Sequence, residues 1–217
     1  MTVSASGSYA VSVTDANGCK ASCTSSITLA PASTCSGIRT ESQTTWGATA
    51  SGSNPAAYMV GNFATAFPSP NYLTIGCGNR TLRLTSAAAV TAFLPSTGSV
   101  ARLPVGTLQN PGSSYGNTFA GQLVALKLSV RFDELSASFS GSTTLLKDMI
   151  IASGTFSGWT VQQLITAADA KIGGCSSSYS RSTLNTAVTA VNEGYLGGTM
   201  SSGYLACPAS GMQIETG

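Results

Sequence analysis

The chain has 217 residues, of which 10 are basic, 8 are acidic and none is histidine. Only 8% of the residues are charged, against roughly 25% in an average globular protein. The lack of histidine excludes Ser-His-Asp and Cys-His catalytic sets and His-ligated zinc. A net charge of +2 with no basic cluster gives nucleic-acid binding no electrostatic basis.

The first 34 residues predict a β-hairpin. Tyr9, Val11 and Val13 alternate with small or polar residues, which is the period of a strand. The run Asp15-Ala16-Asn17-Gly18 supplies a turn, and a second strand over 21–29 brings in Ile27 and Leu29. An isolated hairpin is marginal in water, so this one must pair with another part of the chain, with an upstream region or with another subunit.

Residues 35–217 predict one mixed domain with short strands and three to four helices, so the fold class is α+β. In its first half we expect an extended polar strand over 38–46, then a loop or short helix over 55–67. Two short strands follow over 72–75 and 81–84, then a helix over 87–94 capped by Ser86, and a loop over 98–117.

The second half of this domain carries apolar residues at helical spacing. One helix is expected over 119–130, one after a cap at Thr160 and one after a cap at Ser182 or Thr183. The last is expected to end at Gly197-Gly198. Residues 149–152 predict a buried strand or a helix end.

Six cysteines form an even set with no second close pair to complete a zinc site: Cys19, Cys23, Cys35, Cys77, Cys175 and Cys207. We therefore expect disulfides and an oxidising, extracellular setting, with metal ligation or free thiols as the rival interpretation. The pairing we favour among the 15 or so connectivities is Cys19–Cys23, Cys35–Cys207 and Cys77–Cys175.

No segment reaches the roughly 18 apolar residues that a membrane span needs, so membrane insertion is not expected. The first residues lack the basic and apolar regions of a signal peptide. We therefore expect a mature or truncated chain, or one piece of a longer precursor.

Acidic residues offer one candidate site. Asp133, Glu134 and Asp148 have the oxygen ligands of a Ca²⁺ site, and Asp133 with Glu134 is the one adjacent carboxylate pair for a glycosidase. The simpler interpretation is a solvated helix end and loop, with Lys147 beside Asp148 as an ion-pair neighbour. We expect no metal, no cofactor and no enzymatic activity.

Other motifs suggest recognition or modification. Asn79-Arg80-Thr81 is an N-glycosylation sequon in a glycine-rich turn. The glycine-flanked Cys77 and Cys175 favour turns held by a disulfide over phosphate loops, because no lysine accompanies them. Five aromatic residues fit either a sugar-stacking platform or the core: Trp46, Tyr58, Phe63, Phe67 and Tyr72.

Two stretches of the chain resemble secreted Bacteroidota surface proteins. The run GSYAVSVTDANGC at residues 7–19 resembles the last hairpin of their immunoglobulin-like (PKD-like) repeats, although the preceding five strands of such a sandwich are missing. The runs FAGQLVALKLSV and IASGTFSGWTVQQLI resemble an uncharacterised domain of the same proteins. The resemblance implies an Ig-like hairpin and a cell-surface location, and no chemistry.

Together these observations predict a structural subunit of an extracellular filament, built head-to-tail from copies of this chain. The hairpin of residues 1–34 would be donated to the next subunit, with Tyr9, Val11, Val13, Ile27 and Leu29 filling an apolar groove. The alternative is a glycan-binding or adhesive module of a large secreted adhesin.

Overall fold

The computed structural model describes residues 7–28, 35–200, 202–208 and 213–215. They fall into two compact units, one formed by the two ends of the chain and one by Cys35–Ala206. The division after Thr34 coincides with the predicted domain boundary. The prediction was wrong at the other end, because Cys207–Gly217 groups with the N-terminal hairpin through a third strand that was not foreseen.

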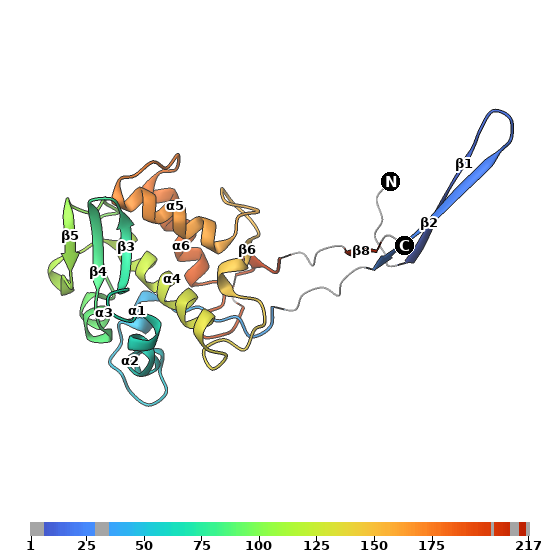
Figure 1. Cartoon of the computed structure of the whole chain (residues 1–217). Helices are drawn as coiled ribbons and strands as arrows, with labels where there is room; N and C mark the ends of the chain where they lie inside the picture. The colour runs from blue at the N-terminus through green and yellow to red at the C-terminus, as the bar shows by residue number, and fades with distance from the viewer. Residues whose placement is uncertain (1–6, 29–34, 201, 209–212, 216–217) are drawn as a thin grey trace. The chain divides into compact units, whose positions relative to one another are not determined.

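The smaller unit is a three-stranded antiparallel sheet in the order β1-β2-β8. Its strands are β1 (Gly7–Thr14), β2 (Lys20–Thr28) and β8 (Gln213–Glu215). β1 and β2 form a long ribbon (Figure 1), closed by a turn in which Asp15 Oδ1 accepts hydrogen bonds from the amides of Asn17 and Cys19. Gly18 adopts a φ of 86°, which favours glycine, so the predicted turn is confirmed.

The larger unit contains a second three-stranded sheet, in the order β3-β4-β5. The predicted pair is confirmed as an antiparallel hairpin of β3 (Leu73–Cys77) and β4 (Arg80–Leu84). β5 (Gly106–Gln109) pairs in parallel with β4. A separate two-stranded ladder joins β6 (Ile150–Ile151) to β7 (Leu205–Ala206).

Helices supply most of the regular secondary structure of the larger unit, and Figure 1 shows them around its small sheets. Those in its first half are α1 (Gln43–Trp46), α2 (Pro55–Ala66) and α3 (Ala87–Phe93). Those in its second half are α4 (Thr118–Leu135), α5 (Val161–Gly173) and α6 (Arg181–Asn192), and two 3₁₀ turns, η1 (Gly112–Ser114) and η2 (Leu146–Asp148), complete the set.

The core forms around α4, which is buried on nearly all sides. It contacts α1, α2, α5, α6 and β3. Leu123, Val124, Leu126 and Leu128 are wholly buried, and consecutive residues on a helix face different directions, so this helix is covered all round. The helix continues beyond the predicted 119–130, which brings Asp133 and Glu134 onto its last turn.

Helix caps explain where the elements begin. Ser86 accepts a hydrogen bond from Ala89 N, as predicted, and Thr160 forms a reciprocal capping box with Gln163. The third cap was misplaced, because Ser180 and not Ser182 or Thr183 starts α6, which ends at Asn192. The α+β class is confirmed, with six α-helices rather than three to four in the described chain.

Two further segments, 38–46 and 98–117, differ from the predicted secondary structure. Residues 38–46 were predicted as a strand, yet Ser42 caps α1 and only Thr40 makes an isolated bridge, to Leu196. The predicted loop over 98–117 contains β5, whose pairing with β4 is made between residues 26 positions apart. The first error overlooked a local helix cap at Ser42, whereas the second concerns a strand that depends on long-range pairing.

Candidate functional site

The β1–β2 ribbon has one apolar face that is open to solvent. Tyr9, Val11 and Val13 stand directly opposite Ser25, Cys23 and Ala21. Residues directly opposite in an antiparallel pair share a face, so these six side chains form one surface. We call it the ribbon face. Val11 is 54% and Val13 64% exposed, which is unusual for apolar side chains on a regular strand.

The other side of the ribbon is polar. Ser8, Ser12 and Thr14 alternate with the apolar residues of β1 and pair with Ser26, Ser22 and Lys20 of β2. The ribbon is therefore amphipathic, like a strand pair that normally rests on a core.

One further predicted interface residue, Ile27, lies at the end of the ribbon opposite the turn. Ile27 pairs with Gly7 on one side and with Ile214 of β8 on the other. Leu29 lies outside the described residues. Of the five interface residues predicted from sequence, Tyr9, Val11 and Val13 are brought together on the ribbon face.

No strand of the described chain pairs with the outer edge of β1. Among the described residues β1 pairs with β2 alone, and β8 covers only residues 26–28 of β2. Half of the backbone N–H and C=O groups of β1 therefore point away from the sheet without a strand partner, which is the usual template for pairing with another chain.

The predicted Cys19–Cys23 disulfide is wrong, because both thiols are free and exposed. Cys19 immediately precedes β2 and Cys23 lies within it. Four residues of extended strand span about 13 Å, whereas a disulfide needs Cα atoms within about 7 Å.

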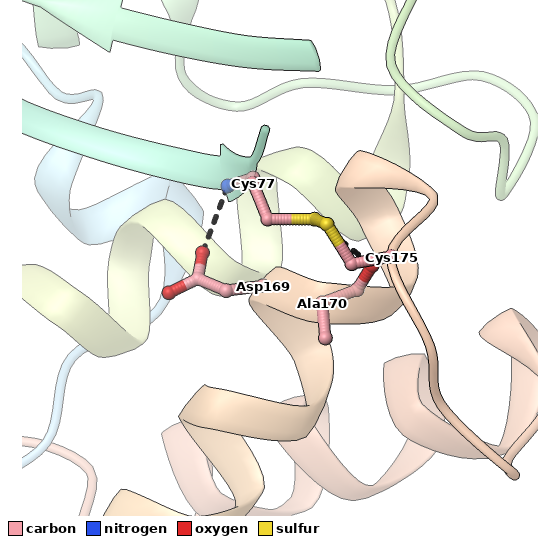
Figure 2. Close-up of a disulfide and its surroundings, with 5 residues drawn as sticks. Cys77, Asp169, Ala170 and Cys175 are labelled. Carbon is pink, nitrogen blue, oxygen red and sulfur yellow. Dashed lines mark hydrogen bonds between the residues drawn. A yellow bond between two sulfur atoms is a disulfide. The ribbon is translucent and has the colours of Figure 1, made fainter. Parts of the chain in front are cut away.

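The predicted disulfide between Cys77 and Cys175 is present, with Cα atoms 6.3 Å apart. It joins the end of β3 to the loop after α5 (Figure 2). A Cβ on Gly173 would overlap the backbone N and Sγ of Cys77, so the close approach of helix and strand requires glycine there. Cys35 and Cys207 are also disulfide-bonded. Two disulfides are compatible with a secreted protein.

A partly buried ion pair lies beside this disulfide. Asp169 on α5 accepts hydrogen bonds from Gly76 N at 2.9 Å and from Lys127 Nζ at 2.5 Å (Figure 2 shows Asp169 beside the strand end). Burial raises the pKa of the Asp169 carboxyl, against the opposing effect of Lys127. Lys127 also donates to Thr74 O, so these groups tie α4, α5 and β3 together and have a structural role.

The sequon lies in an accessible turn. Asn79 is exposed between β3 and β4, and its carbonyl accepts a hydrogen bond from Gly106 N at 2.6 Å. Thr81 shares a hydroxyl hydrogen bond with Thr107. Asn79 is thus exposed, and its glycosylation stays a prediction.

The structure does not bring Asp133, Glu134 and Asp148 together as a metal site among the described residues. Asp133 is buried and accepts a hydrogen bond from Leu146 N at 2.6 Å, so it holds η2 against α4. Burial raises its pKa, although hydrogen bonds from Ser140 and Leu146 oppose the shift. Among the described residues no three Asp, Glu, Cys or His side chains are placed to hold a metal ion.

The negative charge of Glu134 is balanced by two basic side chains. Its carboxylate contacts Arg131 at 3.2 Å and Lys147 at 3.0 Å. Lys147 thus pairs with Glu134 rather than with its neighbour Asp148, which is exposed on η2. Asp133 and Glu134 thus have separate partners and Asp148 is exposed, so we assign the three carboxyl groups no ligand.

Most of the aromatic residues considered as a sugar platform belong to the core. Trp46 and Phe63 are buried, and Trp46, Tyr58 and Phe67 surround Phe132 with ring centroids 5.3–6.3 Å away. Tyr72 lies at the edge of this group, with Arg83 over its ring. The core interpretation therefore holds for Trp46 and Phe63, whereas Phe67 and Tyr72 are half-buried and line the same surface pocket.

An arginine-lined hollow was not anticipated. Arg80, Arg102 and Arg181 line a hollow of about 890 Å³ together with Tyr115. None of the three forms an ion pair within the described ranges, although Arg80 donates to Leu103 O. Three of the six basic side chains that make no ion pair within the described residues thus line this hollow.

A second, uncharged pocket also escaped the sequence analysis. It has a volume of about 440 Å³ and lies between α5 and the loop before α6. Trp159 and Tyr179 line it, and each immediately precedes the N-cap of a helix, Thr160 or Ser180. The sequence does show an aromatic residue directly before each helix cap. It does not show that Trp159 and Tyr179, 20 residues apart, lie side by side.

Comparison with known proteins adds no further constraint, because no protein-family model, curated protein or solved structure matches the chain. No helix in the described part of the chain is long and apolar enough to cross a membrane.

Proposed function

We propose that this chain is a structural subunit of an extracellular filament or surface polymer, in which the N-terminal ribbon of one copy adds to the next. The observation that carries the proposal is the ribbon face beside an open strand edge. Val11 and Val13 remain more than half exposed although they occupy a regular, fully paired strand.

The physical argument is that such a ribbon is incomplete alone. A two-stranded hairpin is marginal in water, and three residue pairs with β8 add little cover. A neighbouring strand on the β1 edge would satisfy its free backbone groups, and apolar side chains over the ribbon face would remove Val11 and Val13 from water.

A second copy of the chain is the partner we favour. With 10 basic and 8 acidic residues, two copies repel one another weakly. The described ribbon carries only Asp15 and Lys20 as charged residues, both near its turn, so charge does not oppose stacking on its apolar face. A ribbon that engages a different surface of the next copy forms an interface that repeats without closing.

An extracellular location fits this proposal. The disulfide-bonded cysteines Cys35, Cys77, Cys175 and Cys207 favour an oxidising compartment. A surface of hydroxyls and amides, with 33 serines and 27 threonines in the chain, suits close packing between subunits.

The test is deletion of residues 1–30 from the full chain. The intact protein should form long filaments visible by electron microscopy, and the truncated protein should remain monomeric while its 35–206 unit keeps its melting transition. Filaments from the truncated protein would exclude ribbon addition, and a strictly monomeric intact protein would exclude the polymer itself.

A further inference from the structure

The uncharged pocket beside α5 has the composition of a sugar-binding site. Its volume of about 440 Å³ falls in the range of roughly 300–1,000 Å³ common for small-molecule sites. No charged side chain lines it. The lining residues are Trp159, Gln162, Gln163, Thr166, Ala167, Ala170, Ser176, Ser177, Ser178 and Tyr179.

Two aromatic rings form a fixed corner of this pocket. The Trp159 and Tyr179 rings lie 5.4 Å apart at 85° to each other. Both pack on Phe156, which is buried, at 5.1 and 4.7 Å. Trp159 and Tyr179 themselves are only half-buried, so the buried ring holds them in place while part of each remains open to a ligand.

The backbone around the corner is also fixed. Trp159 precedes the capping box of α5, in which Thr160 and Gln163 bond one another reciprocally. Tyr179 precedes Ser180, which caps α6. The intervening loop is held by the disulfide at Cys175 and by Lys171 Nζ, which donates to Ser177 O. The rings are therefore preorganised, which lowers the entropy cost of binding.

Polar groups without partners surround the rings. The side chains of Gln162, Ser176 and Ser178 are exposed and make no hydrogen bond within the described part of the chain. In contrast, Gln163 and Thr166 are already engaged by the backbone of α5. The free groups are a neutral amide, with two donors and two acceptor lone pairs, and two hydroxyls.

We propose that this pocket binds a neutral saccharide unit. A sugar ring has an apolar C–H face, which packs on an aromatic ring, and a rim of hydroxyls, which bond amides and hydroxyls. An acidic sugar is disfavoured, because no charged side chain lines the pocket and Lys171 Nζ is already bonded to Ser177 O. The site is independent of the ribbon and does not rest on the filament proposal.

The fluorescence of Trp159 can report binding at this pocket. It has two tryptophans, of which Trp46 is wholly buried in the core and Trp159 lines the pocket. We would titrate the full-length chain with a panel of neutral oligosaccharides of glucose, galactose, mannose and N-acetylglucosamine. A saturable change in tryptophan fluorescence, with calorimetry to measure Kd, is expected for at least one of them.

Variants locate the binding. W159A should weaken binding at least tenfold by calorimetry, and Q162A should weaken it severalfold. Gln162 is exposed and bonds nothing in the described chain, so Q162A keeps the fold. Q109A, at an exposed glutamine on β5, and Y115A, in the arginine-lined hollow, are the matched controls and should bind as the parent chain does.

Three results would overturn the proposal. The first is no binding of any neutral saccharide in the panel up to millimolar concentration. The second is binding that Q162A and W159A leave unchanged. The third is a preference for uronic-acid oligosaccharides that R102A abolishes, which would place recognition in the arginine-lined hollow instead.

Discussion

Replacing Val11 and Val13 by threonine tests the ribbon face directly. Both residues keep a β-branched shape, so the double variant V11T/V13T should retain the strand. The exposed fractions of 54% and 64% together amount to about 1.2 fully exposed valines. Covering a valine completely stabilises by about 1.5–3 kcal/mol, so burying both in an interface is worth about 2–3.5 kcal/mol.

Threonine forfeits much of this gain. It keeps one methyl group and introduces a hydroxyl whose burial without a partner costs about 1–3 kcal/mol. We therefore expect each interface to lose at least about 2 kcal/mol. Since every 1.4 kcal/mol or so is a factor of ten in an equilibrium constant, the critical concentration for assembly should rise at least about 30-fold.

Sedimentation of polymer across a concentration series measures this critical concentration. The matched control is S12T/S22T, which adds β-branched residues to a directly paired position on the polar face. It should assemble as the parent chain does. Fluorescence of the buried Trp46 checks that the larger unit is intact in both variants. Assembly of V11T/V13T at the parental concentration, or an equal defect in S12T/S22T, would refute the role of the ribbon face.

The other predictions concern stability and thiol chemistry. D133A should lower the free energy of unfolding in urea by about 1–3 kcal/mol, because Leu146 N loses its acceptor, whereas D133N should cost less by keeping an acceptor without a buried charge. Burial raises the pKa values of Glu41, Asp133 and Asp169, so the folded chain binds protons more readily than the unfolded chain. Their stabilising contribution is complete below the ordinary pKa values of 3.8–4.5 and is lost as pH rises through the raised ones, so the melting temperature should increase from pH 7 toward pH 4.5. Removing the Cys77–Cys175 bond, which spans 98 positions, should cost about 4–5 kcal/mol by the chain-entropy estimate. Ellman's reagent should titrate the free Cys19 and Cys23 in the native protein, and C19S/C23S should not react.

Each of these predictions has a contrary result. Equal loss in D133A and D133N would mean that the charge of Asp133, not its acceptor, matters. A melting temperature that falls steadily below pH 7 would contradict the raised pKa values, and D133N should flatten the pH dependence. Unchanged stability of C77A/C175A would mean that native contacts alone order the loop. A native protein without reactive thiols would contradict the free, exposed state of Cys19 and Cys23.

Local signals predicted the parts of the fold that local interactions determine. Alternation at Tyr9, Val11 and Val13 with a turn-forming Asp-Ala-Asn-Gly run located the hairpin, because strand period and turn geometry are both short-range. Ser86 and Thr160 marked two helix starts for the same reason. The formation of these elements depends on interactions between residues only a few positions apart.

Long-range pairing decided the elements that were missed. β5 is four residues within a glycine- and proline-rich run, and its only support is its parallel pairing with β4. β8 exists through its pairing with β2, nearly the whole chain away. The Trp159–Tyr179 corner depends on how α5 and α6 pack. Such contacts join residues far apart in the chain, so local sequence spacing does not predict them.

The pairing of β8 with β2 makes the larger unit an insertion within a sheet. Within the described residues, the last residue of β2, Thr28, and the first residue of β8, Gln213, are direct partners across an antiparallel pair. Such partners have Cα atoms only about 4.5–5.5 Å apart. The two strand ends that flank the larger unit therefore lie side by side, which is the geometry that lets one domain be inserted into another.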